Sequence, residues 1–314
     1  MDNILKILYD TRGVYSYDDI LECFGFGEGV EISTERKSLL ALSPDNSATI
    51  TLIDDYSDYY KMFLYPEEPN GFFTGGSYDS ICKIENKFDL IFGVCKYTKE
   101  WREKHFGVDI NKRIHTPPTF SEKFIYPNQE KTIPVYFTAH NRPSPILPYI
   151  FDAVKKCDGT IVDASRHAPI THVEKMRLNG QSKISITYNL LFLHKRQAAF
   201  IMSIPNWSDN EAFKNLHSGL MPQIKTRVFE AAFSKSVILH KFDEWNVIED
   251  WYTPNEDFIY FDGEDDLIDK IHEINKNYDA YKYIAENAYN KAINNYTTKH
   301  FIEKYILPNT KLEV

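Results

Sequence analysis

The sequence predicts an α/β protein in which sheets of parallel strands are covered by helices. Short apolar runs bounded by polar or turn residues alternate with amphipathic stretches along the chain, a pattern typical of βαβ units rather than of all-α or all-β proteins. The length of 314 residues allows roughly two domains. We find no internal repeat and no low-complexity segment in the sequence.

Apolar runs in the first part of the chain predict three strands, at Asn3–Tyr9, Ala48–Ile53 and Phe88–Val94. The charged stretch 97–106 after the third run predicts a helix, with Gly107 as its C-cap. Pro117 and Pro118 follow, and two prolines can continue neither a helix nor a central strand. We therefore place a boundary near residues 117–130 and expect a first domain over residues 1–124.

A second alternation of elements begins at Ile133. Residues 133–139 predict a strand, 146–157 a helix and 159–165 the next strand, which together make one βαβ unit. Further strands are predicted at Lys183–Thr187, Ser236–His240 and Asp257–Phe261, and further helices at Pro222–Phe233, Glu264–Asn275, Tyr278–Asn294 and Thr298–Ile306. We expect a second domain over residues 125–284 and terminal helices over 285–314 that cross back onto the first domain.

Composition and charge place the chain among globular proteins. Apolar residues make up 43% and charged residues 26%, and 36 Lys and Arg face 45 Asp and Glu, so the net charge is −9. This balance argues against a protein held on nucleic acid by its overall charge. A local basic strip, His194–Arg196, could still bind phosphate, so nucleic acid is not excluded as a partner.

The cysteines and the apolar runs indicate a reducing compartment and no membrane span. The four cysteines have no CxxC spacing, which argues against a zinc site or a disulfide framework and favours reduced core thiols; they are Cys23, Cys82, Cys95 and Cys157. No apolar run reaches the roughly 18 residues that a transmembrane helix needs. The start, MDNILKILYD, is too short and too acidic for a secretory signal, so we expect a cytoplasmic protein.

The most informative stretch is Met221–Asp269. It carries an Arg, an aromatic-Glu-Ala helix start, a strand and a Tyr-Asp-Asp-Leu segment, at Arg227, Phe229–Ala231, Val237–Leu239, Tyr260, Asp262, Asp266 and Leu267. This pattern resembles the donor-sugar half of GT-B glycosyltransferases, and within them it looks most like CgeB-like, glycosyltransferase family 1-type proteins. The closing helix Ile284–Thr297 is also similar, so the resemblance covers about residues 180–306.

The resemblance implies a fold and an activity. The fold would be two Rossmann-like domains facing each other across a cleft, with C-terminal helices. The activity would be that of a hexosyltransferase-type enzyme, which moves a sugar from a nucleotide-diphosphate sugar to a hydroxyl of an unidentified glycan, small-molecule or macromolecular acceptor. We expect no cofactor besides the donor and no metal. The alternative is a sugar- or nucleotide-binding module that has kept the fold and lost turnover.

Two positions depart from the family pattern. The family usually has Gly in the turn after the Glu helix, where this chain has Ser234 or Lys235; we expect the change to be tolerated if the turn keeps φ negative. The retaining pattern has a second Glu eight residues before Glu230, where this chain has Pro222. The second departure leaves inversion and retention both open.

Several residues of the second half suit a nucleotide-diphosphate sugar. The loop His217, Ser218 and Gly219 is predicted to precede a helix, and the N–H groups at a helix start attract anions. Lys225 and Arg227 add positive charge for the diphosphate. By resemblance, Glu230 binds the ribose hydroxyls; the alternative for Arg227 and Glu230 is a surface pair at i,i+3.

Two further candidates follow predicted strands, at the edge of the sheet where open α/β folds bind ligands. Arg142 follows the strand 133–139 and could bind phosphate, with His140 beside it. Asn189 follows the strand 183–187, at a position where the family commonly has Asn; it could bind a donor hydroxyl or cap the next segment.

For catalysis, we expect a residue at the carboxyl end of a strand in the first domain. The candidates are Asp10, Asp54, Asp55 and the stretch Cys95–Tyr97. The alternative is that the aspartates belong to turns or helix N-caps. The glycines of GFGEG, residues 25–29, follow a helix-like stretch and predict a turn rather than a dinucleotide loop.

Overall fold

The computed structural model of the chain describes residues 3–9, 21–27, 29–42, 53–65, 85–97, 103, 109–139, 144–163 and 170–312. The chain forms two compact units, and each combines segments that are distant in the sequence. Unit 1 contains residues 1–120, 193–224 and 298–314, and unit 2 contains residues 121–192 and 225–297. Sequence patterning predicted contiguous domains, because local signals do not reveal a segment that leaves one unit and returns to it.

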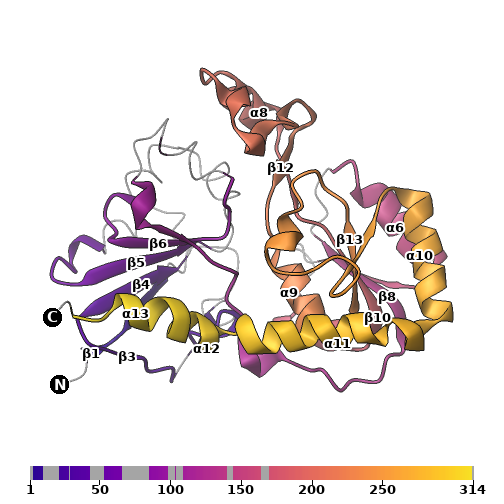
Figure 1. Cartoon of the computed structure of the whole chain (residues 1–314), viewed down its shortest axis with the longest axis horizontal. Coiled ribbons are helices and arrows are strands. Elements are labelled where there is room, and N and C mark those ends of the chain that lie inside the picture. Colours follow the sequence, from indigo (N-terminus) through magenta and orange to yellow (C-terminus); the bar gives the residue numbers. More distant parts are fainter. Residues whose placement is uncertain are drawn as a thin grey trace. The chain divides into compact units, whose positions relative to one another are not determined.

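The sheet of unit 1 is parallel, and its strands follow the order of the sequence (Figure 1). These strands are β2 (Lys6–Tyr9), β4 (Ser38–Leu42), β5 (Tyr60–Tyr65), β6 (Leu90–Gly93) and β7 (Arg113–His115). A short antiparallel pair joins β1 (Asn3–Ile4) to β3 (Ser33–Thr34). The predicted strand 3–9 is therefore present with a break at Leu5, and the predicted strand 88–94 is β6.

The structure describes only part of two further elements that were predicted in this region, a strand and a helix. Of the predicted strand 48–53, residues 48–52 lie outside the described residues, and Ile53 begins a helical turn rather than ending a strand. Most of the predicted helix 97–106 also lies outside the described residues.

Side chains of the unit 1 sheet alternate between two apolar clusters. Leu40, Leu42, Met62, Leu64 and Phe92 lie in one cluster. Their sequence neighbours point to the other face, which contains Ala41, Phe63, Tyr65 and Ile91. Because successive residues of a strand point to opposite faces, this alternation buries the sheet on both sides.

The C-terminal segment completes one of these clusters. It consists of α12 (Thr298–Phe301), the π-helical turn η7 (Ile302–Ile306) and α13 (Leu307–Asn309). The ring of Phe301 packs edge-on against Phe92 at 5.1 Å, and the Thr298 hydroxyl donates a hydrogen bond to the Phe24 carbonyl at 2.7 Å. Gly25 has φ of +76°, and a Cβ there would lie 2.4 Å from the Thr298 hydroxyl. Gly25 thus lies in a turn, as predicted for this stretch.

Residues 193–224 form a small structure with its own buried side chains, Ala198, Ile201, Ala212, Phe213 and Leu216. Its elements are α8 (Lys195–Met202), the 3-10 turns η3 (Trp207–Asp209), η4 (Glu211–Phe213) and η5 (Leu216–Ser218), and β12 (Leu220–Pro222) (Figure 1). The predicted helix start at Pro222 is wrong, because Pro222 ends β12 and the helix begins at Thr226.

The sheet of unit 2 is also parallel, with the strand order β14-β13-β10-β8-β9. Its strands are β8 (Ile133–Ala139), β9 (Thr160–Asp163), β10 (Ser182–Thr187), β13 (Val237–Lys241) and β14 (Ile259–Phe261). All five were predicted from the sequence. The order reverses between β8 and β10, and such a switch point is where open α/β sheets bind ligands, beyond the carboxyl ends of the strands.

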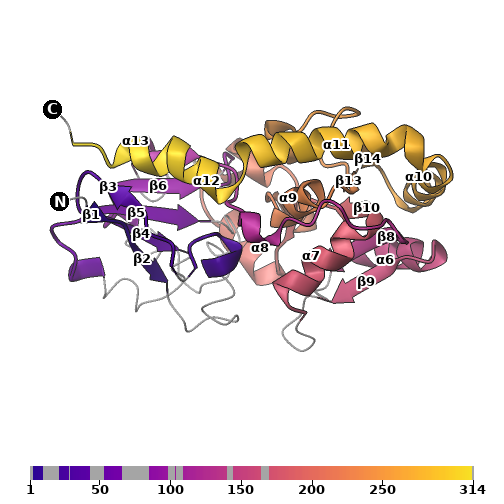
Figure 2. The ribbon, with the colours of Figure 1, turned by 90° about the horizontal axis from the view of Figure 1, so that it is seen from below.

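Helices cover both faces of the unit 2 sheet (Figure 2). α6 (Leu147–Lys156) and α10 (Glu264–Lys276) pack together on one face, and α7 (His172–Gly180), α9 (Thr226–Phe233) and α11 (Tyr278–Asn295) pack on the other. The remaining short elements are β11 (Leu190–Phe192) and the 3-10 turns η1 (Ile110–Lys112), η2 (Glu122–Phe124) and η6 (Val247–Asp250). The predicted α/β class is confirmed. None of the helices in the described ranges is long and apolar enough to cross a membrane.

Two lysines near the carboxyl end of α9 are unusual, Lys235 in its backbone conformation and Lys131 in its pKa. Lys235 adopts φ of 50°, so the turn that usually holds Gly in the family has a left-handed residue here, and the condition under which we expected the change to be tolerated is not met. Lys131 donates from Nζ to the Ser234 carbonyl at 2.8 Å. Burial, with a smaller effect of the Lys235 charge, lowers the pKa of Lys131 to about 7. These contacts lie at the amino edge of the sheet, where β13 begins.

Candidate functional site

Asn189 links the end of β10 to the start of α9. Its side chain is fully buried, and its Oδ1 accepts a hydrogen bond from the backbone N–H of Lys225 at 2.9 Å. Lys225 has an extended backbone and is the N-cap residue of α9. Asn189 therefore fixes the amino end of α9 beside the switch point of the sheet, instead of capping the segment that follows it in the sequence. Its binding of a donor hydroxyl stays a prediction.

The sequence of α9 separates a buried face from a charged first turn. Val228, Phe229, Ala231 and Ala232 are fully buried, and the Phe229 ring packs edge-on against Tyr296 at 5.4 Å. This apolar stripe holds α9 against the sheet and α11. Arg227, in the first turn, stays half-buried, and its side chain makes no hydrogen bond or ion pair within the described part of the chain.

Glu230 is the central residue of the candidate site. It points into the protein, with 3% of its side chain exposed, and its Oε1 accepts from the Lys175 ammonium of α7 at 2.6 Å. An ionised carboxylate is costly to bury unless it is paired. The predicted alternative, a surface pair of Arg227 with Glu230, is wrong, because Glu230 is buried and its partner comes from another helix.

Positive charges around Glu230 outnumber its own negative charge. Burial by itself would raise the pKa of Glu230, but the charges of Lys175, His172 and Arg227 together outweigh burial, so the pKa lies below its usual value. Glu230 is therefore ionised at neutral pH. The basic side chains of Lys175, Arg227 and His172 thus surround the Glu230 carboxylate, and such a cluster of basic groups suits an anionic ligand.

Tyr136 of β8 completes the surroundings of Glu230. Its side chain is 1% exposed, and its hydroxyl lies 3.5 Å from the Lys175 carbonyl. Burial, and next the negative charge of Glu230, raise the pKa of Tyr136. The phenol thus stays protonated at any physiological pH and acts as a neutral wall of the site.

His240 lies at the end of β13, next to β10. It is fully buried, and its Nδ1 lies 2.7 Å from the Thr187 hydroxyl. Burial lowers the pKa of His240, although the carboxylate of Asp243, 3.8 Å from Nε2, opposes this effect. The imidazole is therefore neutral at pH 7 and links the carboxyl ends of two neighbouring strands.

The predicted phosphate loop of His217, Ser218 and Gly219 does not precede a helix. It forms η5 and its C-cap, and β12 follows it, so the helix-start argument for this loop is wrong. Gly219 has φ of +71°, and a Cβ there would lie 3.0 Å from the Leu193 carbonyl. Gly219 is thus required by a local close approach, and His217 packs against Trp207 at 5.2 Å.

Two of the predicted catalytic aspartates, Asp54 and Asp55, are not at the carboxyl end of a strand. Asp54 and Asp55 lie in the turn that leads into β5, at the amino edge of the sheet, so their predicted position is wrong. Asp54 is exposed and accepts from Lys87 Nζ at 2.6 Å, as a surface ion pair does. The sequence pattern predicted a strand that ends at Ile53, whereas Ile53 lies in a helical turn.

The structure describes some of the remaining candidate residues and not others. Asp10, Arg142 and His140 lie outside the described residues. Cys95–Tyr97 follows β6 as predicted, with Cys95 buried and Lys96 Nζ 5.1 Å from the centroid of the Tyr97 ring. Cys23, Cys95 and Cys157 form no disulfide within the described residues, and Cys82 lies outside them. Within the described ranges, no group of His, Cys, Asp and Glu is arranged to hold a metal ion.

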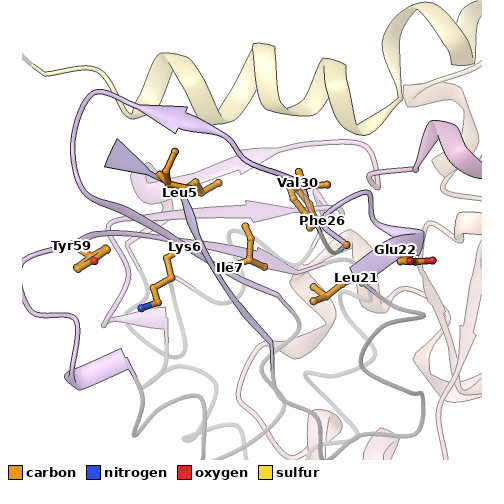
Figure 3. Close-up of a pocket in the computed structure, with 10 residues that line it drawn as sticks. Leu5, Lys6, Ile7, Leu21, Glu22, Phe26, Val30 and Tyr59 are labelled. Atoms are coloured by element: carbon orange, nitrogen blue, oxygen red, sulfur yellow. The ribbon is translucent and has the colours of Figure 1, made fainter. Parts of the chain in front are cut away.

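A separate cavity lies in unit 1 and shares no residue with the sites above. It has a volume of about 890 Å³ and is lined by Ile4, Leu5, Lys6, Ile7, Leu21, Glu22, Phe26, Gly27, Val30 and Tyr59. In Figure 3, Lys6 and Tyr59 lie at one end and Glu22 at the other. The Lys6 ammonium lies 4.6 Å from the centroid of the Tyr56 ring.

Sequence reasoning missed the partners of Glu230. Lys175 and His172 belong to α7, whose sequence HVEKMRLNG alternates poorly between apolar and polar faces, so no helix was predicted there. The available signal was Thr171, which caps α7 by accepting from the Glu174 N–H at 3.1 Å. Even with that helix, its contact with α9 is tertiary and has no sequence motif.

The fold and the site together define a class of protein: a two-unit α/β protein with a cationic site at a sheet switch point. Residues 163–306 match the family described as glycosyl transferase-like. A comparison with curated proteins gave no match. The chain has the GT-B fold of glycosyltransferases, as the sequence predicted. The narrower likeness to CgeB-like proteins stays a prediction.

Solved structures that are similar to this chain include three bacterial proteins. TarM from S. aureus has 12% sequence identity and a TM-score of 0.55, over 87% of this chain and 54% of TarM. The pneumococcal O-GlcNAc transferase GtfA, in complex with UDP and GlcNAc, has 11% identity and a TM-score of 0.54, over 88% of this chain and 57% of GtfA. Anabaena HepE, in complex with UDP and glucose, has 10% identity and a TM-score of 0.57, over 88% and 78%. The chain spans just over half the length of TarM and GtfA.

Proposed function

We propose that the chain is a glycosyltransferase that moves a hexose from a nucleotide-diphosphate sugar to a hydroxyl group of an acceptor, without a metal. The observation that carries this proposal is the buried, ionised Glu230 beside a surplus of positive charge at the amino end of α9. A nucleotide-diphosphate sugar offers both matching groups, because its ribose hydroxyls donate hydrogen bonds and its diphosphate is an anion.

In the proposed reaction, the bond between the anomeric carbon and the diphosphate oxygen breaks, and a bond from that carbon to the acceptor oxygen forms. The acceptor proton goes to a base that we do not assign, and the nucleoside diphosphate leaves. Arg227 and the first N–H groups of α9 would stabilise the charge that develops on the leaving diphosphate. Glu230 would accept hydrogen bonds from the ribose hydroxyls.

The ligands in the structures of the relatives suggest which donor base to test first. The structures of GtfA and HepE contain UDP, so UDP-sugars are the first donors to test. We infer no acceptor from them, because the chain spans just over half of GtfA.

A thermal-shift screen tests the proposal with UDP-, GDP-, ADP-, CMP- and dTDP-linked sugars. A ligand that binds the native state raises the melting temperature, by an equivalent of about 2.7 kcal/mol at a concentration of 100 Kd. We expect one donor class to raise it and the same donor to release nucleoside diphosphate slowly. A screen in which no donor changes the melting temperature would refute the proposal.

The second candidate is a binding module without turnover. It is favoured by Pro222, which ends β12 and stands where the retaining pattern has a second Glu. The release assay separates the two candidates: a donor that binds tightly and releases no nucleoside diphosphate, with or without acceptor mixtures, would favour the module.

A further inference from the structure

Lys175 is the partner of Glu230, and it comes from a helix that carries none of the predicted donor residues. Its Nζ lies 2.6 Å from Oε1 of Glu230, and the side chains of Lys175 and Glu230 are 19% and 3% exposed. A carboxylate so deeply buried takes up a proton unless a cation compensates its charge. A protonated Glu230 would have lost part of its capacity to accept hydrogen bonds.

We propose that Lys175 is a positioning residue of the donor site, which holds Glu230 as the ionised acceptor of the two ribose hydroxyls of a nucleotide-diphosphate sugar. The inference rests on the proposed function. Two carboxylate oxygens offer about four acceptor positions, so one bond to Lys175 leaves room for two hydroxyls. Lys175 acts through Glu230 and needs no contact with the donor.

Other charged groups around Glu230 contribute less than Lys175. Lys175 is the strongest of the three positive groups that lower the pKa of Glu230, ahead of His172 on the same helix and Arg227 on α9. Tyr136 faces it from β8 and stays neutral. The salt bridge is therefore the main compensation for the buried charge, and its loss should raise the pKa of Glu230 toward the neutral range.

The test is the pH dependence of donor affinity in Lys175→Met, measured by titration of the full chain with the donor that the screen identifies. At pH 8 we expect an affinity near that of wild type, and at pH 5.5 a loss of about tenfold or more, because each unit of pKa above the pH removes another tenfold of ionised Glu230. The wild-type affinity should change much less over this range. Lys175→Arg, which keeps the charge, should restore the wild-type profile.

Two controls separate this effect from other causes. Arg177→Met removes a cation from the exposed side of the same helix, where Arg177 pairs with Glu174 at 2.6 Å, and should leave the profile unchanged. The charge of His172 also acts on Glu230, so the comparison is repeated in a His172→Gln background. If Lys175→Met does not fold, Lys175→Gln replaces it, since Gln keeps a hydrogen-bond donor without the charge.

The outcomes distinguish the inference from the proposed function. Donor binding by wild type with parallel pH profiles for wild type and the uncharged Lys175 variant would overturn the inference alone. A wild-type protein that binds no donor would overturn the proposed function and, with it, the inference. A steeper loss of affinity at low pH in the uncharged variant, cancelled in Lys175→Arg, would support both.

Discussion

Two buried ion pairs, one in each unit, differ in their place along a parallel sheet and in the charges around them. In unit 1, Glu85 and Arg113 lie just before β6 and at the start of β7, so they are at the amino edge; Nη1 and Oε1 are 3.1 Å apart, and both side chains are almost fully buried. In unit 2, Glu230 lies in the second turn of α9 and Lys175 at the end of the first turn of α7, and both helices begin on the carboxyl side of the sheet. Burial of an ion pair therefore does not by itself indicate a ligand site. The position of the pair along the sheet and the charges around it are what indicate one.

The largest effect is expected for the ion pair of unit 1. Glu85→Gln leaves the Arg113 charge buried without its carboxylate, and loss of one partner of a buried pair costs about 3–5 kcal/mol of unfolding free energy. Denaturant unfolding measures this loss. Donor affinity of the folded variant should stay unchanged, whereas Glu230→Gln should weaken it. Equal loss of affinity in both variants would contradict the assignment of the donor site to unit 2.

The next effect is expected at the carboxyl edge of unit 2. Arg227→Ala should lower turnover by roughly 100-fold or more, because it removes charge that stabilises the leaving diphosphate. The melting temperature should stay near that of wild type, since Arg227 is half-buried and in the first turn of α9. Arg177→Ala is the matched control on the exposed side of α7. A rate that does not change in Arg227→Ala would remove this residue from the mechanism.

The smallest effect is expected at the other end of α9. Lys235 adopts φ of 50°, and its ammonium lies 2.9 Å from Glu286. Both Lys235→Gly and Lys235→Ala lose this ion pair, but only Gly takes the left-handed backbone without strain, so Lys235→Gly should be the more stable by about 1 kcal/mol. Urea unfolding of the two variants checks the difference, and donor affinity should be the same in both.

Local patterning predicted unit 2 better than unit 1. The strands of unit 2, such as β8 and β13, are apolar runs bounded by polar or turn residues, so each carries its own signal. β4, SLLAL, has the same kind of signal but was not predicted. The predicted strand end at Ile53 also placed Asp54 and Asp55 at the wrong edge of the sheet. Period and composition cannot tell whether a short apolar segment enters a strand or a helical turn.

The candidate site was predictable only in part. Glu230 and Arg227 were found through a resemblance to a known family, and Asn189 through its place after a strand. Lys175 could not be found in this way, because its role depends on the packing of α7 against α9. A tertiary contact between helices 55 residues apart in sequence leaves no trace in the local pattern.

The return of the C-terminal helices to unit 1 affects the order in which the protein can mature. Phe301 and Ile306 belong to the same apolar cluster as Leu40 and Leu64, so a nascent chain that has emerged through unit 2 still lacks part of the interior of unit 1. During translation, the first sheet must therefore wait, with one side incompletely covered, while nearly 200 further residues are synthesised. During that interval, the exposed apolar surface can bind chaperones or aggregate.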